Sequence, residues 1–220
     1  MVFMLQISKV NRLVSIGLIT MAVLSFGNFT GQPVSNVVVP LGVVLFFVNR
    51  ALEKNPEDSK ALAFNTLTDK LTSKENILWI FIPAVVSIIN VLISSNFLPQ
   101  YIDYEKERAG AFVTIEMSVL SVLLFFVLAL GEEIAWWAFF QSQLMKVLSP
   151  VMAIAISSIL FTVGHYAVGN PPLVLYGLSF TLINGTLFGL IFYKTRNVWV
   201  STLAHFLANM MELFLYTVLV

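Results

Sequence analysis

Long apolar runs, separated by short polar segments, limit what this chain can fold into more than any other feature of its sequence. Runs of roughly twenty apolar residues recur along the 220 residues, and about twenty such residues are what a helix needs to cross a bilayer. Charged residues make up only 11% of the chain, against about a quarter in a typical soluble domain. We therefore predict an all-α fold, a polytopic membrane helix bundle.

The polar punctuation between the apolar runs predicts about seven transmembrane helices, with six to eight as the range. We expect them over about 10–26, 34–49, 77–96, 111–131 with an extension to 147, 149–166, 173–193 and 197–219. The length suits one membrane domain, so we interpret residues 1–220 as a single integral-membrane domain.

The distribution of Lys and Arg predicts the orientation of the bundle. With seven helices and a cytoplasmic N-terminus, the outer side holds only Lys106 and Arg108. The cytoplasmic side then holds the other ten basic residues: Lys9, Arg12, Arg50, Lys54, Lys60, Lys70, Lys74, Lys146, Lys194 and Arg196. Cytoplasmic loops carry such an excess, so we expect the N-terminus inside and residues 50–76 as a cytoplasmic polar loop.

Charge and cysteine content exclude several kinds of function. The formal net charge is zero, so the sequence shows no electrostatic footprint for nucleic acid. The chain has no cysteine, which excludes disulfides, thiol catalysis and thiolate metal sites.

Ionisable residues inside the apolar segments point to a functional site, because such residues are costly in a membrane. They occur at three places: Glu132 with Glu133, His165, and His205 with Asn209. The two histidines of the chain both belong to this set. Glu212 follows on the last helix, and we expect it near the outer interface.

Helix geometry predicts that these side chains meet. The chain turns near Ser149, and Glu132 and His165 lie about equally far from that turn, roughly 25 Å at 1.5 Å per residue. His205 and Asn209 are four residues apart and share a helix face. We expect one intramembrane cavity, facing the cytoplasm. Since Pro171 and Pro172 should end the helix soon after His165, the loop behind it should line that cavity.

This set of residues can support peptide-bond hydrolysis. Glu132 could take a proton from water that His165 orients, while His205 and Asn209 could donate hydrogen bonds to an oxyanion. Alternatively, Glu132, His165 and His205 could hold zinc with a bound water, although the HExxH pattern is missing. No cofactor is required by the sequence.

The three places together resemble the CAAX protease and bacteriocin-processing family of intramembrane proteases. Glu132-Glu133 matches the start of its Glu-Glu-x-x-x-Arg motif, Phe161 with His165 its Phe-x-x-x-His motif, and His205 with Asn209 its His-x-x-x-Asn/Asp motif, all within about residues 125–215. The resemblance implies an intramembrane endopeptidase with Glu132 as water-activating base, aided by His165, with Glu133 as companion acid and His205 and Asn209 stabilising the oxyanion.

The resemblance also sets the expected partners and location. The substrate would be a peptide or a membrane protein, in bacteriocin or signal-peptide maturation or in self-immunity. We expect an integral protein of a bacterial plasma membrane, in contact with the lipid bilayer.

One position departs from the family motif. Where the motif has Arg, this chain has Trp137, which cannot reproduce the charged fork of a guanidinium. If that Arg pairs with Glu133, then Glu133 lacks its partner here. A non-catalytic immunity or scaffold protein, binding a peptide or partner in the same cavity, is therefore the alternative. A small proton-coupled carrier is a third interpretation, weakened by the lack of internal repeats.

Overall fold

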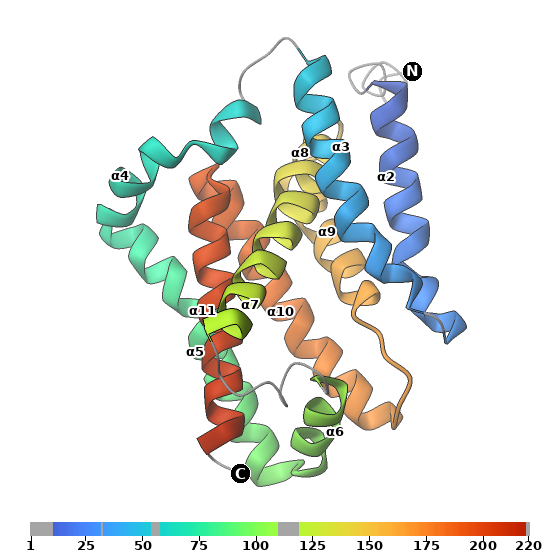
Figure 1. The fold of residues 1–220 in the computed structure, drawn as a ribbon, viewed down its shortest axis with the longest axis vertical. Helices are drawn as coiled ribbons and strands as arrows, with labels where there is room; N and C mark the ends of the chain where they lie inside the picture. Colours follow the sequence, from blue (N-terminus) through green and yellow to red (C-terminus); the bar gives the residue numbers. More distant parts are fainter. Residues whose placement is uncertain (1–10, 32, 54–57, 110–118, 219–220) are drawn as a thin grey trace.

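A computed structural model describes residues 11–31, 33–53, 58–109 and 119–218, and all regular structure within these ranges is helical (Figure 1). The prediction of a polytopic helical membrane bundle is confirmed, because five of the helices are long and apolar enough to cross a membrane. They span Val34–Leu52, Lys74–Phe97, Leu120–Leu144, Pro171–Thr195 and Val198–Val218. Residues 111–118 of the fourth expected helix lie outside the described ranges.

The helices follow one another in the order expected from the apolar runs. They are α2 (Arg12–Ser25), α3 (Val38–Leu52, entered through the 3-10 turn η2, Val34–Val37), α5 (Lys74–Phe97), α7 (Val119–Glu132), the π-helix η6 (Glu133–Gln141), α8 (Ser142–Leu144), α9 (Pro150–Gly164), α10 (Pro171–Thr195) and α11 (Val198–Val218).

Two of the seven expected transmembrane helices are shorter than predicted. α2 has 14 residues and α9 has 15, which at 1.5 Å per residue is about 21–23 Å, less than the roughly 30 Å of a hydrocarbon core. The side chain of Asn28, just after α2, donates to the carbonyls of Gly164 and Tyr166 at the end of α9. The two short helices are therefore tied together at their ends.

Local signals fix where the helices after residue 141 begin and end. The Ser149 side chain accepts from the Met152 amide, and Pro150 starts α9, a position that suits proline since its missing N–H has no helical partner. Pro171 also starts a helix, α10, but without a side-chain cap. α10 ends at Thr195, the next residue Arg196 has a left-handed backbone at φ 50°, and the chain then reverses into α11.

The polar segment 50–76 forms a connection with short helical stretches. It contains η3 (Asp58–Leu62), η4 (Phe64–Thr66) and α4 (Leu67–Thr72). The Trp199 indole donates to the Leu62 carbonyl at 3.1 Å, and the Asn197 amide donates to the Ala63 carbonyl at 3.0 Å. These bonds attach the segment to the start of α11.

A further helix, α6 (Gln100–Ala109), was not predicted. It lies at the opposite end of the bundle from α4, close to the start of α10 and the end of α11 (Figure 1). Its residues Tyr101 and Ile102 are buried, so α6 packs against the bundle although most of its residues are polar. This end of the molecule is called the α6 end below.

Candidate active site

The two adjacent glutamates lie where the fourth long helix changes its winding. Glu132 is the last residue of α7, and Glu133 is the first of the π-helix η6, whose nine residues are all buried. The Ser142 hydroxyl donates to the Trp137 carbonyl at 3.2 Å, five residues back. Short π-helical segments within α-helices occur frequently at functional sites, and this one places two carboxylates beside α11.

Glu133 is the centre of a buried hydrogen-bonded group. Its Oε1 lies 2.9 Å from Nδ1 of His205, and the Trp137 indole N–H donates to the same oxygen at 3.0 Å. Both Glu133 and Trp137 have no exposed surface, and His205 is 5% exposed. Because a carboxylate only accepts hydrogen bonds, this contact favours a proton on Nδ1 of His205. His205 therefore turns Nε2 away from Glu133.

Glu132 lies on the other side of the same imidazole. Its Oε2 is 3.7 Å from His205 Nε2, and its side chain is 22% exposed. His205 is thus held between a fully buried carboxylate and a partly exposed one. The partly exposed one, Glu132, is the acid that water can reach.

His165 is fixed at the end of α9. Its Nδ1 is 2.8 Å from the Phe161 carbonyl, which can only accept, so Nδ1 carries a proton and the neutral imidazole has its lone pair on Nε2. The loop that follows is supported as expected for irregular backbone at depth: Ser35 and Asn28 both donate to the Gly164 carbonyl.

A cavity of about 340 Å³ joins three of the predicted residues, because His165, His205 and Asn209 all line it. The Phe188 ring stacks on His205 with centroids 4.1 Å apart, and Phe161 lies 4.3 Å from His165 and 6.4 Å from His205. Glu132 is not among the lining residues and is connected to the cavity through His205. The structure therefore brings the three motifs together.

The cavity also contains residues that the sequence did not point to. Glu212 accepts from the Asn90 amide at 2.7 Å and from the Tyr216 hydroxyl at 2.8 Å, and all three line the cavity. Glu105 and Arg108 of α6 line it as well and form an ion pair at 2.8 Å. Glu212 was expected near the outer interface. As an ionisable residue on the same apolar helix as His205, Glu212 could have been predicted to lie near the site. Nothing in the sequence linked it to α5 or α6.

The candidate zinc ligands Glu132, His165 and His205 do not form a ligand group. Within the described residues, no three His, Cys, Asp or Glu side chains are grouped so that they could hold a metal ion. Each histidine uses Nδ1 for a protein contact and would offer Nε2 to a metal ion. As arranged here, the three side chains are not grouped around one metal ion, and the reaction proposed below uses the side chains alone.

Comparison with known families decides the resemblance. Residues 114–211 match the family model described as type II CAAX prenyl endopeptidase Rce1-like. The expected resemblance to the CAAX-protease family is confirmed over these residues. Neither the curated proteins nor the solved structures give a match. The Rce1-like family is a peptidase family, and the long apolar helices together with this family mark an integral membrane protein.

Trp137 lies four residues after Glu133, and its indole N–H is a hydrogen-bond partner of that carboxylate. Position 137 gives Glu133 no charged partner, but the indole N–H donates a hydrogen bond to its Oε1. Gly189 of α10 makes room for the ring: a Cβ there would lie 3.3 Å from Cζ3 of Trp137 and 2.6 Å from Oε1 of Gln141. Position 137 therefore supplies a neutral hydrogen-bond donor, and Gly189 leaves the space that the indole ring occupies.

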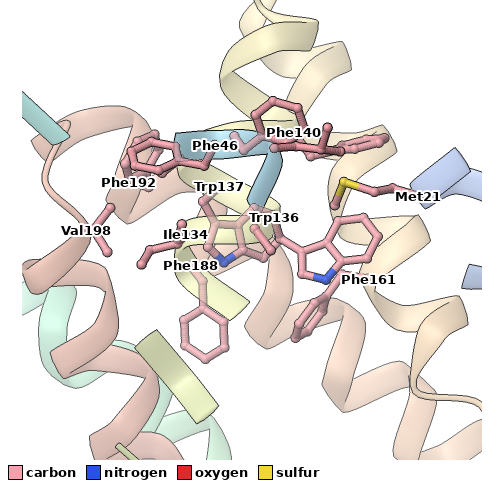
Figure 2. Packing of buried hydrophobic residues seen from close by; sticks show 14 of the residues in the cluster. Met21, Phe46, Ile134, Trp136, Trp137, Phe140, Phe161, Phe188, Phe192 and Val198 are labelled. Carbon is pink, nitrogen blue, oxygen red and sulfur yellow. The ribbon is translucent and has the colours of Figure 1, made fainter. Parts of the chain in front are cut away.

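The aromatic residues around this segment are part of the core. Figure 2 shows Trp136, Trp137, Phe140 and Phe161 packed within one cluster of buried side chains. None of these four is more than 3% exposed. Phe161 also lines the cavity, whereas Trp136, Trp137 and Phe140 are buried in the packing beside it.

Proposed function

We propose that this chain is an intramembrane endopeptidase that hydrolyses a peptide or a membrane-associated protein with water activated by Glu132. The observation that carries the proposal is the placement of His205 between Glu132 and Glu133, beside a cavity shared with His165 and Asn209. Membership of a peptidase family supports it.

In the proposed reaction, Glu132 accepts a proton from the attacking water as general base. Nε2 of His165 accepts the second hydrogen bond of that water, because its Nδ1–H is committed to Phe161. The water oxygen bonds to the scissile carbonyl carbon. The carbonyl oxygen becomes an oxyanion.

The oxyanion would accept hydrogen bonds from Nε2–H of His205 and from the Asn209 amide. An imidazole that donates from both nitrogens is an imidazolium, and the Glu133 carboxylate at 2.9 Å from Nδ1 can balance that charge. When the C–N bond breaks, Glu132 returns its proton to the leaving amine. The products are a carboxylic acid and an amine, and Glu132 is ready for another water.

The first experiment follows cleavage of a fluorogenic peptide library by the protein purified in detergent. We expect clear cleavage by the parent and none by Glu132→Ala or His205→Ala, with all three eluting as folded protein. Cleavage that both variants retain would exclude these residues as the catalytic site. Activity in detergent, where no ion gradient exists, also separates a protease from a proton-coupled carrier.

A non-catalytic binding protein remains the second proposal because of Trp137. Under that proposal the cavity would hold a peptide or partner without cutting it. The variant Trp137→Arg separates the two: a many-fold rise in cleavage above a nearly silent parent would favour the binding protein. An active parent, with no gain from Trp137→Arg, favours the endopeptidase.

A further inference from the structure

The cavity extends from the catalytic residues towards one end of the bundle only. α10 lines it with residues from Gly177 to Phe188 and with none of its last seven residues. α11 runs the opposite way and lines it with residues from His205 to Thr217 and with none of its first seven residues. The start of α10 and the end of α11 both lie at the α6 end (Figure 1).

Helix α6 confirms this direction, since four of its residues line the same cavity: Tyr101, Glu105, Lys106 and Arg108. The Arg108 guanidinium also lies 3.5 Å from the carbonyl of His165. In the part of the chain that the structure describes, no residue of segment 60–74 or of α8 lines the cavity. The cavity therefore leads from His205 to the α6 end.

Basic residues gather at the other end of the bundle. Lys194 pairs with Glu75 at 2.7 Å, so the end of α10 meets the start of α5 there. Lys146 pairs with Glu53, so the segment after α8 meets the end of α3. Within the described residues, this end carries Arg12, Arg50, Lys60, Lys70, Lys74, Lys146, Lys194 and Arg196. The α6 end carries only Lys106 and Arg108.

The positive-inside rule assigns the basic end to the cytoplasm. The expected cytoplasmic N-terminus and the expected cytoplasm-facing cavity therefore cannot both hold, because they require opposite ends of the same bundle. The rule rests on eight basic residues against two in the described chain. The expected direction of the cavity rested on the resemblance and on the lengths of apolar runs, which include neither α6 nor the shortness of α2 and α9.

We propose that the cavity opens on the non-cytoplasmic face of the membrane, so that the substrate is an exported peptide or an outward-facing segment of a membrane protein. The substrate class rests on the proposed function, whereas the direction of the opening does not. A reaction that exports or exposes the peptide must then come before cleavage.

Accessibility of single cysteines tests the direction, because the chain has no cysteine of its own. Three exposed positions suit the test: Asp103 on α6, Thr217 at the cavity, and Lys60 at the basic end. Each is changed to Cys in the full chain, and right-side-out spheroplasts are treated with a charged, membrane-impermeant maleimide before and after permeabilisation. The cysteine-free parent is the blank.

We expect Asp103→Cys and Thr217→Cys to be labelled in intact spheroplasts and Lys60→Cys only after permeabilisation. The reverse pattern would overturn the proposal, as would labelling of Thr217→Cys only after permeabilisation while Asp103→Cys reacts from outside. The labelling needs no enzymatic activity, so an inactive parent leaves this result readable. Conversely, if the parent is active and the labelling pattern is reversed, the outward opening is contradicted and the proposed endopeptidase function stands.

Discussion

Two carboxylates beside the same cavity are held in similar ways but differ in what they touch. Oε1 of Glu133 accepts from Trp137 and faces Nδ1 of His205, and Oε1 of Glu212 accepts from Asn90 and Tyr216. Glu133 has no exposed surface, whereas Glu212 is partly buried and lines the cavity.

The difference teaches that two hydrogen bonds to a carboxylate do not by themselves mark a reaction centre. Glu133 is coupled to an imidazole, which can change its charge, and through it to Glu132. The hydrogen-bond donors to Glu212 are an amide and a phenol, which remain neutral near pH 7. We therefore expect Glu133 to act through His205, and Glu212 to shape the cavity.

The largest effect on peptide cleavage should come from a third acid, Glu132. The change Glu132→Gln keeps the size of the side chain and removes its ability to accept a proton, so peptide cleavage should fall by about 10²–10⁴-fold. Steady-state cleavage of the best library peptide measures this. Thermal unfolding in detergent should be nearly unchanged, because the side chain is partly exposed. Unchanged kcat would remove Glu132 from the mechanism.

Glu133→Gln should come next. The amide oxygen can still accept from Trp137 and His205, but it carries no charge to balance an imidazolium. A hydrogen bond to a charged group contributes about 1.5–3 kcal/mol, so kcat should fall about 10- to 100-fold. The same substitution at Glu212 is the matched control. An equal loss in both variants would contradict the distinction between the two carboxylates.

Trp137→Phe tests the hydrogen bond that the Trp137 indole donates to Glu133. The phenyl ring still fills most of the space against Phe161, 5.5 Å away between ring centroids, but the indole N–H to Glu133 is lost. We expect a loss of about 1–2 kcal/mol in stability, seen as a lower unfolding temperature in detergent. Cleavage should fall less than in Glu133→Gln. A larger fall in cleavage would mean that the indole positions Glu133 more strongly than His205 does.

The sequence revealed Glu133 and His205 because both belong to short polar patterns within apolar segments. Glu133, His165 and His205 stand out there, since ionisable residues are rare in such surroundings. Equal depth on antiparallel helices predicted that Glu132 and His165 meet. In the structure His165, His205 and Asn209 line one cavity, and Glu132 reaches it through His205. The apolar runs likewise revealed the five long helices.

The contacts of Glu212 with Asn90 and α6 could not be predicted in this way, because these residues lie in distant segments without a distinctive pattern. Asn90 lies within a generic apolar helix and pairs with a residue 122 positions away. α6 is polar along most of its length, so it resembles a loop until Tyr101 and Ile102 are seen buried. The π-helix was equally invisible, because no residue pattern distinguishes it from the α-helix that it continues.

Glu212→Gln should have the smallest effect. Its amide oxygen can accept from both Asn90 and Tyr216 as the carboxylate does, and the new NH₂ group can reach the cavity. We expect unfolding to shift by less than about 0.5 kcal/mol, the range of substitutions that leave no buried group unpaired. Cleavage of a neutral peptide should hardly change, while peptides with Lys or Arg near the cut should lose affinity, because the cavity has lost a negative charge. Measuring KM for matched Lys and Gln peptides tests this, and an unchanged ratio between the two would show that Glu212 has no part in substrate choice.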